Sequence, residues 1–434
     1  MKTPKTVDSR ERVLLLGVGV KRTRKLAGET AGAAERESLV ELEELALSAG
    51  ANVVGSLLQI RDTLDPATLI GKGKLEELKI EAEMRKAPLV IVDRNLTPGQ
   101  QRNMEQAIDC RVIDRTQLIL DIFAKHARTR EGQLQVELAQ LNYLLPRLTG
   151  RGVELSRLGG GIGTRGPGEQ KLETDRRRIR ERVGKIQDAI ETVRKQRATR
   201  RRARQAVPLG MVALVGYTNA GKSTLFNALT KAEVLTSSKM FATLDPTVRA
   251  VRLPSRWRVL VSDTVGFLRD LPPALIAAFR ATLEEVQEAS LIMQVTDVSN
   301  PQNEEQDAAV EKVLKDLGAE DRPRLRVFNK IDQMPEEELA ALMKSRADGS
   351  VFVSAKTGEG IEELLRRIDK AMPVDPLVRT RLRVPMSEGR YLALVYTCGR
   401  VLESSVDDGH MNIDAELPES LARRLEEFSE EGAG

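Results

Sequence analysis

The chain is poor in the residues that carry much metal and redox chemistry: its 434 residues include only two cysteines and two histidines. This scarcity argues against a histidine-based metal site and against a serine–histidine relay. Cys110 and Cys398 lie far apart in apolar contexts, so we expect each to be a reduced, small core residue. No apolar run approaches the roughly 18 residues that a membrane-spanning helix needs. Asp8, Glu11 and the lack of a small-residue cleavage site argue against a signal peptide, and we expect a cytoplasmic protein.

One stretch of the chain nearly dictates its ligand. Residues 216–224 read GYTNAGKST and fit the pattern G-x-x-x-x-G-K-[ST], in which backbone N–H groups close around phosphate oxygens at a helix N-terminus. An apolar run, Met211 to Val215, precedes it, so strand, loop and helix come in the required order. We expect Lys222 on the β- and γ-phosphates and the Ser223 hydroxyl on Mg²⁺. The predicted phosphate-binding residues are Gly216, Tyr217, Thr218, Asn219, Ala220, Gly221, Lys222, Ser223 and Thr224.

Two later segments favour guanine as the base. A carboxylate such as that of Asp332 accepts hydrogen bonds from the adjacent N1–H and N2–H₂ donors that guanine presents, whereas adenine offers the wrong pattern. The Ala355 N–H is expected on the guanine O6. Each segment follows an apolar strand, as a loop at the end of a sheet would. The predicted guanine-binding residues are Asn329, Lys330, Ile331, Asp332, Ser354, Ala355 and Lys356.

Two further segments occupy the positions of nucleotide-dependent switches. The first, switch I, consists of Phe241, Ala242, Thr243, Leu244 and Asp245, and Thr243 is the expected second Mg²⁺ hydroxyl. The second, switch II, consists of Asp263, Thr264, Val265, Gly266 and Phe267, with the carboxylate near Mg²⁺ through water and the glycine N–H near the γ-phosphate. Five motifs in this order and spacing predict a GTPase domain. Phe267 stands where many GTPases carry the glutamine that orients the attacking water, so we expect slow intrinsic hydrolysis that a partner completes.

The hydrophobic periodicity predicts a multidomain α/β protein. Three short apolar strands, at Val13 to Val20, Ala51 to Gln59 and Leu89 to Asp93, alternate with helices over residues 11–113, which indicates parallel βαβ units. Two helical stripes follow, one at Leu134, Leu138, Leu141 and Leu145, and one at Ile179, Val183, Ile186, Ile190 and Val193. We expect an N-terminal α/β domain (1–113), a long helical hairpin (114–207) with a glycine-rich tip loop (149–168), a P-loop GTPase domain with a mainly parallel sheet (208–372), and a small C-terminal α+β domain (373–434).

The hairpin carries an unusual charge excess. Residues 176–204 contain thirteen Lys or Arg against three Asp or Glu, and a phosphate backbone rewards such an excess through counterion release. The tip loop has eight glycines and no aromatic residue. It is either a flexible linker or a probe that orders against structured RNA. The candidate RNA contacts are Arg151, Arg157, Arg165, Arg176, Arg177 and Arg178.

The motif set resembles the translation-factor-related GTPases and, among them, the HflX family. The stretch SRLGGGIGTRGPGEQKLETDRRR (Ser156 to Arg178) and FATLDPT (Phe241 to Thr247) carry the most specific part of the resemblance. The resemblance implies a factor that binds the large (50S) ribosomal subunit and its rRNA, reaches toward the peptidyl transferase centre, and splits or rescues stalled ribosomes with GTP. GTP, GDP and Mg²⁺ are the implied ligands.

Two other functions stay open. The chain could be a GTP-gated assembly or anti-association factor, which would bind free large subunits without splitting joined ones. It could also remodel rRNA with ATP at the N-terminal domain, a reading that rests on Gly71-Lys72-Gly73-Lys74 and on family reports of ATP use there. That turn lacks the spacing of a phosphate loop, so an ordinary helix start is favoured. We expect a cytoplasmic monomer, with peripheral association with a membrane left open.

Overall fold

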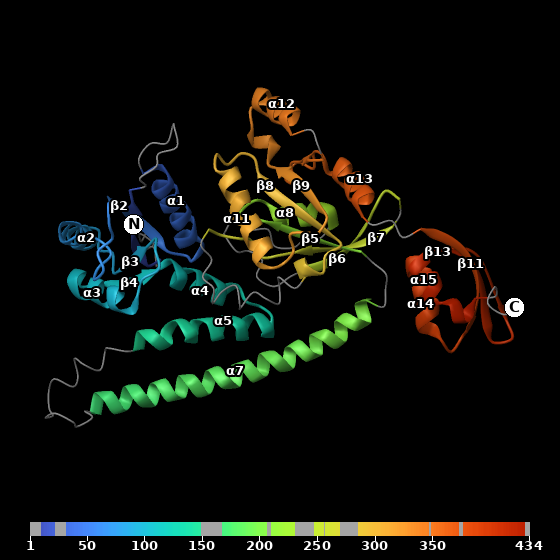
Figure 1. Ribbon diagram of the computed structural model, residues 1–434, viewed down its shortest axis with the longest axis horizontal. Coiled ribbons are helices and arrows are strands. Elements are labelled where there is room, and N and C mark those ends of the chain that lie inside the picture. Colours follow the sequence, from blue (N-terminus) through green and yellow to red (C-terminus); the bar gives the residue numbers. More distant parts are fainter. Residues whose placement is uncertain are drawn as a thin grey trace, which may run out of the picture. The chain divides into compact units, whose positions relative to one another are not determined.

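Figure 1 shows the computed structural model of the chain. It describes residues 10–21, 32–148, 167–205, 210–230, 247–255, 257–269, 285–346, 349–372 and 376–429; of residues 33, 167–172 and 197–205 it describes the backbone alone. The chain forms two compact units, and most of the first is the stretch up to Ile190.

A four-stranded parallel sheet in the order β2-β1-β3-β4 organises the N-terminal part. Its elements are β1 (Arg12–Val20), α1 (Ala33–Ser48), β2 (Asn52–Arg61), α2 (Lys72–Met84), β3 (Leu89–Val92), α3 (Pro98–Ile108), β4 (Arg111–Asp114) and α4 (Arg115–His126). The expected parallel alternation is confirmed. Strand β4 was not among the expected strands, because its sequence, RVID, has only two apolar residues between two charged ones. Gly71 caps α2, and Lys74 pairs with Glu77 at 2.7 Å, so this turn is a helix start.

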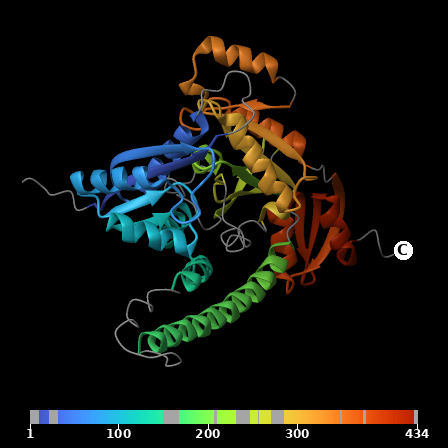
Figure 2. The same cartoon turned by 60° about the vertical axis from the view of Figure 1, so that its left-hand side comes forward.

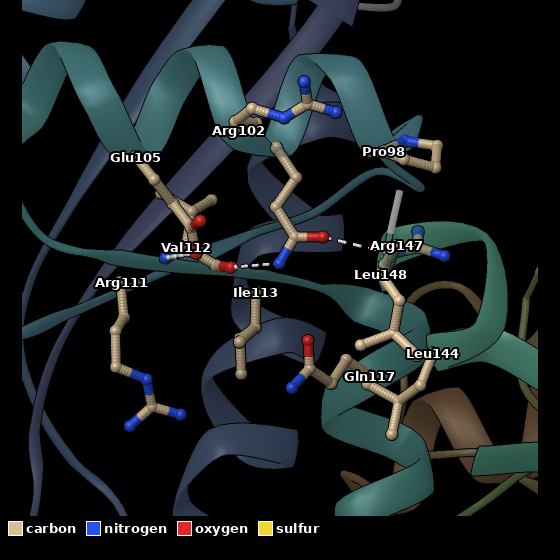
Figure 3. A pocket seen from close by; sticks show the side chains of 11 residues that line it. Pro98, Arg102, Glu105, Arg111, Val112, Ile113, Gln117, Leu144, Arg147 and Leu148 are labelled. Carbon is tan, nitrogen blue, oxygen red and sulfur yellow. Dashed lines mark hydrogen bonds between the residues drawn. The ribbon is translucent and has the colours of Figure 1, made fainter. Parts of the chain in front are cut away.

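Side chains of α3 close the outer edge of strand β4. Gln101 Nε2 donates to the Val112 carbonyl oxygen (2.8 Å), and the Val112 N–H donates to Glu105 (3.2 Å). Arg147 Nε donates to Gln101 Oε1 (3.0 Å), and Arg147 pairs with the buried Asp114. Most of these residues line a pocket of about 470 Å³ (Figure 3). The polar side chains of Gln101, Glu105 and Arg147 already bond to protein groups. We therefore interpret this pocket as part of the packing that covers the edge of the sheet.

The helical hairpin consists of α5 (Arg130–Leu144), η1 (Leu145–Leu148) and α7 (Pro167–Gln205). Thr129 accepts from the Gly132 N–H (3.0 Å) and caps α5, so α4 and α5 are separate helices. Arg182 of α7 donates twice to the carboxylate of Glu137 on α5. Figure 2 shows α7 as one continuous helix. The predicted stripe of α7 is shielded from solvent along its length, since Ile179, Val183, Ile186, Ile190 and Val193 are all buried or half-buried.

The nucleotide-domain sheet has six strands in the order β10-β9-β8-β5-β7-β6, with β6 antiparallel to β7 and the other neighbours parallel. Its elements are β5 (Met211–Gly216), α8 (Lys222–Thr230), β6 (Thr247–Arg252), β7 (Arg258–Asp263), β8 (Leu291–Asp297), α11 (Asn303–Asp316), β9 (Arg324–Asn329), η2 (Ile331–Gln333), α12 (Glu336–Ser345), β10 (Val351–Phe352) and α13 (Ile361–Ala371). The carboxyl ends of the parallel strands share one edge, where α/β proteins bind ligands.

The C-terminal part is a three-stranded antiparallel sheet in the order β11-β13-β12. Its elements are β11 (Leu377–Pro385), α14 (Gly389–Cys398), β12 (Arg400–Asp407), β13 (His410–Pro418), α15 (Glu419–Arg424) and η3 (Glu426–Phe428). Asp408 and Gly409 have φ angles of 46° and 72°, as the tight turn of a β-hairpin requires. The expected multidomain α/β fold, with a small α+β domain at this end, is confirmed.

Candidate functional site

The predicted phosphate-binding loop joins β5 to α8. Gly221 has φ 88°, in the left-handed region, and a Cβ there would overlap the side-chain amide of Asn329. A Cβ at Gly216 would overlap the Val295 carbonyl oxygen. Both glycines are therefore required by close approach of the chain, and Gly221 also by its backbone conformation. Lys222, Ser223 and Thr224 form the first turn of α8, so the loop leads into a helix N-terminus that favours anions.

The Lys222 ammonium is buried against this loop. Its Nζ donates to the carbonyl oxygens of Gly216 (3.1 Å) and Tyr217 (2.7 Å). Burial lowers the pKa of Lys222 to about 8, although the nearby Asp263 carboxylate acts in the opposite direction. Negatively charged phosphate oxygens at this site would restore the charged form and raise the pKa again.

Nucleotide binding should therefore take up a proton at alkaline pH. With a pKa near 8, about nine-tenths of Lys222 is neutral at pH 9 and about one-tenth at pH 7. Binding of GDP should then take up close to one proton at pH 9, and GDP affinity should fall as the pH rises above 8. Calorimetry in two buffers of different ionisation enthalpy measures this uptake. Equal binding enthalpies in both buffers at pH 9 would show that Lys222 stays charged without nucleotide.

Oxygen donors suited to a hard cation meet beside Lys222. Ser223 Oγ donates to Asp263 Oδ2 at 2.7 Å, and Asp263 is fully buried at the end of β7. A hydroxyl and a carboxylate are the ligand types that Mg²⁺ prefers, so these two residues fit the expected ion. The hydroxyl of Thr264, the residue after β7, donates to the Leu214 carbonyl oxygen of β5 (2.5 Å) and is not directed at the ion site. Switch I, with Thr243, lies outside the described residues.

The predicted guanine-binding segments are brought together by Asn329. Its Nδ2 donates to the Ala220 carbonyl oxygen (2.9 Å), and its Oδ1 accepts from the Ala355 N–H (3.0 Å). Ser354 Oγ donates to Asp332 Oδ1 (2.7 Å) and fixes one oxygen of that carboxylate. These bonds join the phosphate-binding loop to the two base segments. Ile331 is buried beneath them, and Lys356 is exposed at the rim.

Switch II runs along the phosphate-binding loop. The Thr218 N–H donates to the Phe267 carbonyl oxygen (2.8 Å), and the Phe267 N–H donates to the Gly216 carbonyl oxygen (3.1 Å). A Cβ at Gly266 would lie 2.8 Å from Thr218 Cα and 2.9 Å from Lys222 Nζ. The Phe267 side chain is 2% exposed. Glycine is thus required at 266 by space, and the Phe267 ring is a packing group in this conformation.

The RNA-contact candidates are only partly described. Arg177 and Arg178 are exposed on α7, with side-chain accessibilities of 73% and 75%, while Arg176 is half-buried. Their ion pairs within the helix are 3.8 to 3.9 Å long, and exposed pairs of this kind contribute little. Arg151, Arg157, Arg165 and the rest of the tip loop up to residue 166 lie outside the described residues.

Two contacts at the site were not expected from the motifs. The Tyr217 hydroxyl accepts from the Arg269 N–H (2.9 Å), which fixes the chain just after switch II. Asp297, at the carboxyl end of β8, pairs with Lys330 at 2.6 Å. The sequence contains one signal for Asp297, because it ends an apolar strand as Asp263 does.

The two free cysteines are half-buried, and burial raises the pKa of the Cys110 thiol to about 11.

Models of four protein families match consecutive parts of the chain. They are described as GTP-binding GTPase N-terminal (residues 36–124), GTP-binding GTPase middle region (126–204), 50S ribosome-binding GTPase (211–330) and HflX C-terminal domain (341–431). Among the residues that the structure describes, no helix combines the length and apolar character needed to cross a membrane.

Curated relatives cover nearly the whole chain. A GTPase HflX from Caldanaerobacter subterraneus subsp. tengcongensis is 48% identical over 394 residues, which is 91% of this chain and 90% of the relative. A GTPase HflX from Escherichia coli K12 is 42% identical over 393 residues, or 90% and 92% of the two chains. A solved GTP-binding protein from Sulfolobus solfataricus, in complex with GDP, is 22% identical, with a TM-score of 0.45 and coverage of 83% of this chain and 98% of that chain.

Proposed function

Since the chain belongs to the HflX family of GTPases, we propose that it hydrolyses GTP on the large ribosomal subunit and thereby splits or rescues stalled ribosomes. Its GTPase activity follows from the family, and residues 211–330 match the model of a 50S ribosome-binding GTPase. The observation that carries the guanine-nucleotide part of the proposal is the pair of hydrogen bonds that Asn329 makes, one to the phosphate-binding loop and one to the second base segment. We place the protein in the cytoplasm.

The phosphate-binding loop and Lys222 would bind the phosphates. Backbone N–H groups of residues 219–223 would surround the phosphates, and Lys222 would exchange its two carbonyl partners for β- and γ-phosphate oxygens. Its charge would offset the negative charge of the γ-phosphate during in-line attack by water. Gly266, packed beside Lys222 Nζ, would present its N–H to the same phosphate group.

Mg²⁺ fits this site, and it would neutralise phosphate charge when bound. Ser223 and Thr243 would hold it directly, and Asp263 would contact it through water. The contact between Ser223 and Asp263 already holds both side chains in place, so this part of the ion's surroundings would need little rearrangement.

Asp332 would select the base. Ser354 occupies Oδ1, and the carboxylate would accept from the two adjacent donors on guanine, while the Ala355 N–H would exchange its present partner, Asn329 Oδ1, for the guanine O6. Ser354 itself is fully buried, and its Oγ also accepts from the Thr357 N–H (3.1 Å). The carboxylate is thus supported by a buried group and would bind the base with little reorganisation.

The basic helix α7 supports an rRNA partner. Replacing Arg176, Arg177 and Arg178 together by alanine should weaken binding to large subunits and lower the slope of log affinity against log salt by about 2 to 3 units. GTP affinity of the isolated protein should be unchanged. The control is the triple alanine variant of Arg366, Arg367 and Lys370 on α13, which removes the same charge from another helix. Equal losses in both variants would show that only net charge matters.

Light scattering separates the proposed splitting role from assembly or anti-association. Addition of the protein with GTP to joined ribosomes should lower the scattering, and sedimentation should show free subunits. If the protein binds free large subunits but leaves joined ribosomes intact, the assembly role replaces the splitting role. The ATP-dependent role has no support from Gly71–Lys74, which starts α2 as an ordinary helix turn.

A further inference from the structure

Asp297 occupies a buried position beside the base segments that no motif explains. It ends β8, the strand between β5 and β9, and its side chain is 10% exposed. Its Oδ2 lies 2.6 Å from Lys330 Nζ, whose side chain is 21% exposed. A partly desolvated pair of this kind interacts more strongly than a surface pair, because less water screens it. Each of the two charged groups therefore restricts the position of the other.

The other carboxylate oxygen of Asp297, Oδ1, makes hydrogen bonds that orient the group. Oδ1 accepts from the Ser299 N–H (3.0 Å) and from the Ser299 hydroxyl (2.5 Å). These bonds leave Oδ2 directed at Lys330. The backbone fixes the spacing as well, since the Val298 N–H donates to the Asn329 carbonyl oxygen (3.1 Å). Asp297 is thus oriented from its own loop and from the neighbouring strand.

Lys330 is held at both of its ends. Its backbone has φ 66°, a left-handed conformation that is uncommon outside glycine and asparagine, and it lies between Asn329 and Asp332. Its ammonium is held by Asp297. The four-carbon stem between these two points is then fixed, although a free lysine stem samples many rotamers. A fixed apolar stem offers a flat base a surface to lie against.

We propose that Asp297 is a positioning residue for guanine-nucleotide binding, which holds the Lys330 stem in place against the base without touching the nucleotide itself. This inference rests on the proposed base site. Asp297 would contribute equally to GTP and GDP, because it acts on the base end of the site. Its contribution would appear in nucleotide affinity and KM and not in kcat.

Asparagine at position 297 separates this role from a loop-building role. The Asp297→Asn side chain keeps an acceptor for Ser299 but replaces the charged partner of Lys330 by a neutral one. We expect GTP and GDP affinities to fall together by about 5- to 30-fold, with KM rising equally and kcat unaltered. The matched control is Asp307→Asn, since Asp307 accepts from Thr296 (2.6 Å) near the same end of β8 but lies on α11. That control should retain the parent affinity.

A double-mutant cycle with Lys330→Met tests the coupling. If Asp297 acts through Lys330, the double variant should bind GDP about as weakly as either single variant, within roughly twofold. Multiplying losses, or an unchanged affinity in Asp297→Asn, would overturn the inference. Asp332→Asn in the same titration distinguishes a failure of the Asp297 inference from a failure of the proposed base site. If Asp332→Asn shifts preference to xanthine while Asp297→Asn has no effect, the inference alone fails; if Asp332→Asn keeps its preference for guanine, the base site itself is wrong.

Discussion

Replacing Asp332 by asparagine should turn the protein from a guanine-nucleotide binder into one that prefers xanthine nucleotides. The variant exchanges an acceptor for an amide that can donate to the extra oxo group of xanthine. Its remaining oxygen can still accept from Ser354, so the surrounding loop should be preserved. We expect GTP affinity to fall at least about 100-fold and xanthosine triphosphate to bind more tightly than GTP, because mismatched polar groups that a bound base covers are left unpaired.

Competition titrations with the two nucleotides measure this change. The control is Asp369→Asn, because Asp369 also accepts from a serine hydroxyl, that of Ser255 (2.6 Å), at another place in the fold. The control should keep the parent preference for GTP. A variant at Asp332 that still prefers GTP as strongly as the parent would remove residues 329–332 from the base site.

Glutamine at position 267 should leave turnover by the isolated protein within about threefold of its slow parent rate. The Phe267 ring cannot align a water molecule, and here it is buried while its backbone is bonded to the phosphate-binding loop. A side chain in this packed position has no access to an attacking water. Phe267→Leu, which keeps an apolar group of similar size, is the control for packing.

Single-turnover hydrolysis by the three proteins measures the effect. Comparable rates would support catalysis completed by a partner. A fall of tenfold or more in Phe267→Gln, with Phe267→Leu unaffected, would mean that the glutamine disturbs catalytic geometry that the free protein already has. A fast parent rate would show that a water-orienting group exists within the chain.

The sequence predicted those features that depend on local spacing. The run Met211 to Val215, followed by glycines at 216 and 221, predicts a strand, a tight loop and a helix, because only that backbone path uses both glycines. The HflX resemblance, which rests on similar local stretches, is confirmed by the relatives and the family models. The parallel arrangement of the N-terminal strands also followed from the alternation of strands and helices.

Long-range contacts could not be predicted in this way. The bonds from Asn329 to Ala220 and Ala355 join residues 109 and 26 positions apart, and nothing in the local pattern reveals such pairs. The same limit applies to Asp297, whose relation to Lys330 depends on two strands lying side by side in the sheet. Strand β4 was missed for a different reason, since its two apolar residues stand between charged ones and directly precede a helix.

The most direct test of the proposed function is the GTP turnover of the full chain, measured with and without purified large ribosomal subunits. We expect slow turnover by the free protein and an acceleration of at least about tenfold by the subunits, which corresponds to about 1.4 kcal/mol of transition-state stabilisation. Small subunits alone should give no such acceleration. Turnover that is unchanged across a saturating range of large subunits would contradict the proposal that this partner completes the catalytic site.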